Sequence, residues 1–74
     1  MNNLIRVEVY QRITDATGGR EYRELVISNM AQVPRVGDKV YTVTGIYEVV
    51  QVGWSFLDGK NTHAEVYVVF EGGL

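Results

Sequence analysis

Two stretches in the middle of the chain decide its fold: Pro34–Val40, with the sequence PRVGDKV, and Tyr47–Trp54, with the sequence YEVVQVGW. The ring of Pro34 fixes one of its own backbone angles and favours extended geometry at the residue before it. Glycine and aspartate, at Gly37-Asp38, are residues that turns prefer. The first stretch therefore predicts a rigid loop, a turn over 36–38 and a strand over 39–44. A tight hairpin at Thr44-Gly45 leads into the second stretch.

The second stretch lies in a strand expected over 46–56, whose alternation breaks in the middle. Its large apolar side chains form two sets of opposite parity: Tyr47 and Val49, then Val52, Trp54 and Phe56. A regular strand sends the two sets to opposite faces. One extra residue near Val50-Gln51 would return them to a common face and bend the strand, as a β-bulge does. The alternative is a regular strand buried on both faces.

The flanking sequence predicts three more strands. Residues 4–13 alternate cleanly between apolar and polar. Residues 20–28 follow as a second strand, and the turn residues Thr14–Gly19 between the two indicate a hairpin. A turn at Asp58-Gly59 precedes a strand over 63–71. The expected inward set is Ile5, Val7 and Val9 from the first strand and Ala64, Val66, Val68 and Phe70 from the last. Residues 29–36 are expected to cross the end of the sheet, with a short helical turn over 29–32.

These elements fit one domain spanning 1–74, because 74 residues are too few for two. Five short strands with glycine-containing turns predict an all-β protein, either a small barrel or two packed sheets. We expect a five-stranded, strongly bent antiparallel barrel.

Composition restricts location and class. Seven basic and nine acidic residues give a net charge of −2, and there is no cysteine. Residues 1–6 lack the basic and apolar run of a secretory signal, and no apolar stretch is long enough to cross a bilayer. We therefore expect a cytoplasmic protein without membrane contact.

The residue pattern favours no catalytic or metal chemistry. His63 and Glu65 share one strand face, but two ligands are too few for a metal site. Ser28, Ser55 and Thr62 lack the neighbouring base that nucleophilic catalysis needs. We expect no enzyme activity, no cofactor and no metal.

The two central stretches resemble small proteins encoded by phages, prophages and plasmids. The matching residues are Pro34, Gly37 and Asp38, then Tyr47, Val49, Val52 and Trp54. The resemblance covers roughly the central third of the chain and the final strand. It implies an SH3-like barrel and a mobile-element accessory protein that works by binding, and it carries over no catalytic residue.

Five tyrosines, and arginine at five of the seven basic positions, point to protein binding, because both residue types are enriched at the centres of interfaces. We expect Tyr10 and Tyr67 to be exposed, and Tyr47 and Trp54 to cover core edges. The predicted binding residues are Tyr10, Arg12, Arg20, Tyr22, Arg23, Arg35 and Tyr67.

The predicted function is a small non-catalytic protein-binding module, one version of which inhibits a host protein such as a defence enzyme. The first alternative is a nucleic-acid-binding barrel that stacks bases on exposed aromatics, against which stands the negative net charge. The second is a self-associating virion or assembly component. Unpaired sheet edges also offer a route to a homodimer.

Overall fold

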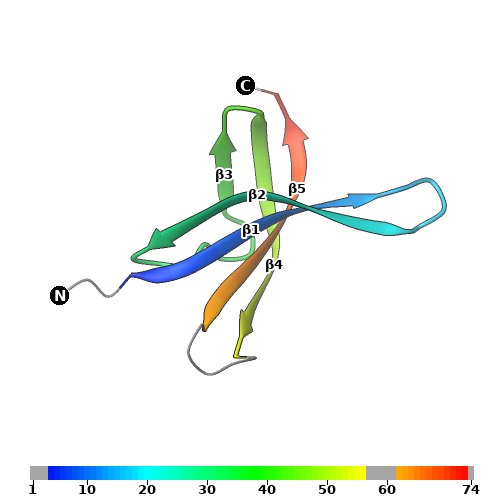
Figure 1. Ribbon diagram of the computed structural model, residues 1–74. Helices are drawn as coiled ribbons and strands as arrows, with labels where there is room; N and C mark the ends of the chain where they lie inside the picture. Colours follow the sequence, from blue (N-terminus) through cyan, green and yellow to red (C-terminus); the bar gives the residue numbers. More distant parts are fainter. Residues whose placement is uncertain (1–3, 57–61, 74) are drawn as a thin grey trace.

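The computed structural model describes residues 4–56 and 62–73, and these form a single curled sheet (Figure 1). Its strands are β1 (Ile5–Thr14), β2 (Arg20–Met30), β3 (Lys39–Thr42), β4 (Gly45–Ser55) and β5 (His63–Gly72). All five predicted strands are confirmed. The helical turn expected over 29–32 is wrong, because β2 continues to Met30 and residues 31–32 form a bend. The turn expected at Asp58-Gly59 lies outside the described residues.

The strand order is β2-β1-β5-β4-β3. The pairs β1–β2, β4–β5 and β3–β4 are antiparallel, but β1 and β5 are parallel. The expectation of an antiparallel barrel is therefore wrong for the central pair. In Figure 1 the long β1–β2 hairpin crosses the β3–β4–β5 unit steeply, and β1 pairs with β5 where the two meet. The edge strands β2 and β3 do not pair with each other, and the sheet is a half-barrel.

The bulge predicted in β4 is confirmed. Val49 lies opposite Val68 and Gln51 opposite Tyr67, which leaves Val50 as the extra residue. A second shift, between Ile46 and Tyr47, lies near the start of the same strand. The bulge at Val50 lets β4 follow the curl of the sheet, because a bulge adds bend and twist, whereas the second shift leaves its extra residue, Glu71, on β5.

The core consists of side chains from the concave face of β1, β4 and β5. Its buried members are Val7, Val9, Tyr47, Val49, Ala64, Val66 and Val68. Val52 packs against this cluster, so the two sets of β4 side chains do share a face. Ile5 lies only partly in the core, at its margin.

Two aromatic residues expected in or over the core are exposed. Trp54 and Phe70 are both 50% exposed, so those two predictions are wrong, whereas Tyr47 is 3% exposed as expected. Phe70 lies edge-on against Tyr47 with ring centroids 5.4 Å apart, and its other side faces solvent. Trp54 pairs with Ala64 near the end of β4, where the half-barrel does not close over it. Alternation predicts the face a side chain takes, not whether that face is covered.

The turn before β3 is held by its own backbone. The Asp38 N–H donates to the Arg35 carbonyl at 2.9 Å, and the Arg35 N–H donates to the Asp38 carboxylate at 2.8 Å. Gly37 takes a φ of 97°, which only glycine adopts readily. Val49 accepts from the Gly37 N–H and donates to the Asp38 carbonyl, both at 2.9 Å. The turn is thereby fastened to β4 beside its bulge.

Candidate functional site: the tyrosine cluster

The parallel pairing of β1 and β5 sets two rows of like residues side by side. Glu8 lies opposite Glu65, and Tyr10 lies opposite Tyr67. These residues alternate with the buried valines of the same strands, so they project from the convex face of the sheet, which we call the outer face.

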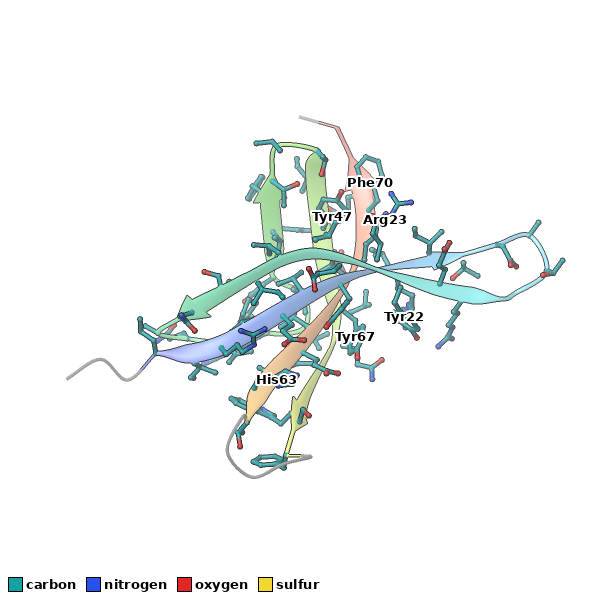
Figure 2. All side chains as sticks on the ribbon, viewed as in Figure 1. Tyr22, Arg23, Tyr47, His63, Tyr67 and Phe70 are labelled. Atoms are coloured by element: carbon teal, nitrogen blue, oxygen red, sulfur yellow. The ribbon has the colours of Figure 1, made fainter. Side chains whose placement is uncertain are left out.

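Three tyrosine rings meet on this outer face, and we call them the tyrosine cluster: Tyr10, Tyr22 and Tyr67. The rings of Tyr10 and Tyr67 stack with centroids 5.8 Å apart and planes 25° apart. Tyr22 of β2 meets Tyr67 edge-on at 5.3 Å and 71° (Figure 2). Tyr22 is 49% exposed, whereas Tyr10 and Tyr67 are half-buried. The two residues expected to be exposed therefore lie outside the core but partly cover each other, and Tyr22 offers the most open ring.

Each of the two stacked tyrosines is anchored by a glutamate two residues earlier on its own strand. The Tyr10 hydroxyl donates to Glu8, and the Tyr67 hydroxyl donates to Glu65 at 2.7 Å. Because these bonds require the phenol proton, they raise the pKa of Tyr10 and of Tyr67 to about 12. The same bond from Tyr10 lowers the pKa of the Glu8 carboxyl. The hydrogen bonds therefore hold the two rings in a defined orientation.

The carboxylates beneath the rings form an acidic floor. Glu8 and Glu65 are directly opposed, which is unfavourable for like charges. Arg6 offsets this, since its Nε lies 3.0 Å from a Glu8 oxygen. Nε2 of His63 lies 3.0 Å from Glu65 and 3.5 Å from Glu8. The histidine therefore bridges the two carboxylates.

These last three residues, Glu8, His63 and Glu65, bring ligand atoms within 4.8 Å of one another. The sequence pattern indicates only two such ligands, His63 and Glu65, because Glu8 lies beside them only through the parallel pairing of β1 with β5. Three ligand residues are enough to bind a divalent cation. The glutamate oxygens, however, already accept bonds from Arg6 and from the two tyrosine hydroxyls. A hydrogen-bonded floor under the rings accounts for the arrangement.

The seven predicted binding residues divide into three groups. The tyrosine cluster is joined on the outer face by Arg12, which pairs with Tyr22, and by Arg20 two residues before Tyr22. Arg23 projects from the opposite side of β2, as Figure 2 shows. Arg35 lies in the turn before β3 and not on β1 or β2. The structure therefore brings together five of the seven, and leaves Arg23 and Arg35 outside the group.

A second exposed surface consists of apolar side chains that the sequence predicts on the core face. Trp54 is 50% exposed and Phe56 is 68% exposed, at the end of β4. The alternation of β4 gave them the same face as the core. Only the strand order, which leaves β2 and β3 unpaired with each other, shows that this part of the face is open.

Comparisons of the chain with protein-family models, with curated proteins and with solved structures returned no match. Within residues 4–56 and 62–73, no helix is long and apolar enough to span a membrane. The function is therefore argued from the geometry of the outer face.

Proposed function

We propose that this protein is a small non-catalytic binding module that contacts a protein partner through the tyrosine cluster. The observation that carries the proposal is the position of Tyr22, half-exposed and supported from below by Tyr67. A rigid aromatic anchor gives contact area at low entropic cost, and tyrosine and arginine dominate the energetic centres of protein interfaces. Arg12 and Arg20 flank the cluster on the same face.

The charges around the cluster favour a protein over a nucleic acid. Glu24 lies opposite Tyr10 on the outer face, and Glu8 and Glu65 lie under the rings. Single-stranded nucleic acid needs a basic groove along its phosphates beside the stacking rings. A mixed face of arginines and carboxylates suits the polar rim of a protein interface better. Nucleic-acid binding remains the alternative, and the same protein variants can test it.

We further propose that the module is a cytoplasmic accessory protein of a phage or other mobile element, acting by occlusion of a host or phage protein. The resemblance of the central stretches to such proteins supports this version. Within the same proposal the fold is SH3-like, which the five strongly curled strands support and the parallel β1–β5 pair qualifies. A self-associating assembly component is the third candidate.

The test is capture of partners by the immobilised protein from an extract of its host cell, with variants that separate the site from the rest of the surface. Tyr22→Ser and Arg12→Glu alter the cluster and its flank. Tyr41→Ser is the matched control, because Tyr41 is a tyrosine 68% exposed on β3, outside the cluster. A specific protein that is retained by wild type and by the control, and lost with both site variants, supports the proposal. Equal capture by all four proteins, or none by wild type, contradicts it.

Nucleic acid is tested with the same four proteins and a pool of short oligonucleotides. A mobility shift of the oligonucleotides that disappears at high salt and in the Arg12→Glu variant would replace the proposed function with the alternative.

A further inference from the structure

We infer that two copies of this chain pair through the free edge of β2, antiparallel and centred on Tyr22. β2 is one end of the sheet, so one side of its backbone has no neighbouring strand. The stretch concerned is residues 20–24, with the sequence REYRE, and all five side chains are exposed. The inference concerns a second copy of this chain and does not depend on the partner proposed above.

The backbone at the tip of the hairpin fixes which groups point outward. The Asp15 N–H donates to the Gly19 carbonyl at 2.9 Å, so this is a hydrogen-bonded pair, and the register continues through Thr14 opposite Arg20. Hydrogen-bonded and non-hydrogen-bonded pairs alternate along an antiparallel ladder. Glu21 and Arg23 therefore bond to β1, and the backbone groups of residues 20, 22 and 24 point to the free edge.

This alternation of bonding directions allows two copies of β2 to pair about a two-fold axis at Tyr22. The Tyr22 N–H and carbonyl of each copy would meet those of the other, as a hydrogen-bonded pair requires. Arg20 would then lie opposite Glu24 of the second copy, and its backbone groups also point outward. The two-fold axis would run perpendicular to the sheet and make the interface isologous. The outer faces of both copies would then lie on the same side of the joined sheet.

The side chains are complementary in this register. Arg20 of one copy opposes Glu24 of the other, and Glu21 opposes Arg23, so every charged position meets the opposite sign. A shift of one residue in either direction places two arginines or two glutamates opposite each other. Parallel in-register pairing opposes like charges at all four positions. The charge pattern therefore selects a single register, since directly opposed like charges destabilise a sheet.

The four charged residues of this stretch form no ion pair with any residue that the structure describes. Within the described part of the chain, ion pairs join Arg6, Lys39 and His63 to glutamates of β1, β4 and β5, and none involves residues 20–24. Charged residues on an edge strand usually prevent association of sheets. In this stretch the order of the charges favours association with one kind of strand only, a second copy of the same strand.

Pairing would also change the proposed binding face. It would set Tyr22 of each copy side by side at the axis, with Tyr67 and Tyr10 next in each subunit. The two tyrosine clusters would then form one continuous face, twice as wide as that of the monomer.

The experiment is sedimentation velocity of wild type and three variants over about 1 µM to 1 mM. Wild type is expected to move from 8.4 kDa toward twice that mass as concentration rises, and to shift back at high salt. Arg23→Glu opposes Glu21 with a second carboxylate at two symmetric sites and is expected to raise the dissociation constant about tenfold or more. The double variant E21R/R23E restores opposite charges and is expected to recover the wild-type constant.

Arg35→Glu is the matched control, because Arg35 is an exposed arginine in a different part of the molecule. A wild type that stays monomeric throughout, a double variant as weak as Arg23→Glu, or a control as weak as Arg23→Glu each overturns the inference. Failure here is separable from failure of the proposed function. Partner capture requires a loss in Arg12→Glu as well as in Tyr22→Ser, and Arg12 lies on β1, outside the paired stretch.

Discussion

Gly45, the first residue of β4, sits where no other residue fits. Its φ is +146°, which L side chains rarely adopt. A Cβ built there would lie 2.5 Å from Cε1 of Phe70 and 2.6 Å from the Gly72 carbonyl oxygen. The phenyl ring could rotate aside, but the carbonyl belongs to β5, whose Gly72 pairs with Ile46. Any side chain at position 45 must therefore push apart the β4–β5 ladder.

The expected cost of Gly45→Ala follows from these two contributions. Forcing a non-glycine residue into this region of backbone space costs about 1–3 kcal/mol, and disturbing a ladder hydrogen bond about 1 kcal/mol more. We therefore expect the free energy of unfolding to fall by about 2–4 kcal/mol, a large share of the ~4–11 kcal/mol typical for a chain of this size. The melting temperature should fall by about 10–25 °C.

Gly53 provides the matched control for the same substitution in the same strand. Nothing lies within 4 Å of a Cβ built at Gly53, and its φ is not positive. Gly53→Ala should change the free energy of unfolding by less than about 1 kcal/mol. The measurement is urea unfolding of the three proteins followed by tryptophan fluorescence or circular dichroism. Equal losses at the two glycines would refute the reasoning, because they would show that neither the backbone angle nor the Gly72 contact matters.

Three further predictions concern the hydrogen bonds and the bulge. The hydrogen bond to Glu8 raises the pKa of Tyr10 to about 12. The contribution of this bond to stability is therefore complete below pH 10.0 and is lost as the pH rises through about 12. In the Tyr10→Phe variant, the free energy of unfolding should depend less on pH in that window. Deletion of Val50 removes the extra residue of the bulge and leaves Tyr47, Val49 and Val52 on one face, so this variant should unfold cooperatively in urea; deletion of Glu8 sends the buried Val7 and Val9 of β1 to opposite faces, so that variant should not. Asp15→Ala removes the carboxylate that accepts from the Gly19 N–H, so amide exchange at Gly19 should become faster by NMR while exchange in the core strands stays unchanged.

The strands and the bulge could be predicted because both depend on neighbouring residues. Alternation of Val7 and Val9 with polar residues marks a half-buried strand wherever it lies in the sheet. The change of parity between Val49 and Val52 requires one extra residue if both are to be buried, and the structure places it at Val50. Local pattern was sufficient in each case.

The candidate site depended on pairings between distant strands, which local pattern does not contain. Glu8 and Glu65 come together only because β1 and β5 are parallel neighbours, and the expected antiparallel arrangement would have placed them elsewhere. The contact of Tyr22 with Tyr67 spans two strand spacings and depends on the twist of the sheet. The exposure of Trp54 follows from the incomplete closure of the half-barrel. Strand order, not composition, decides each of these features.

The open sheet and the ordered outer face together explain why association suits this fold. Among the residues that the structure describes, seven side chains are buried, and the half-barrel leaves both edges and several large apolar side chains in solvent. Contacts with a second chain would cover such surface without changing the fold. The rings of Tyr10 and Tyr67 are already held by Glu8 and Glu65, so little side-chain freedom remains to be lost on binding there. If β2 also joins two copies, each partner would meet two preformed clusters, and the second contact would form at the high effective concentration that a fixed dimer provides.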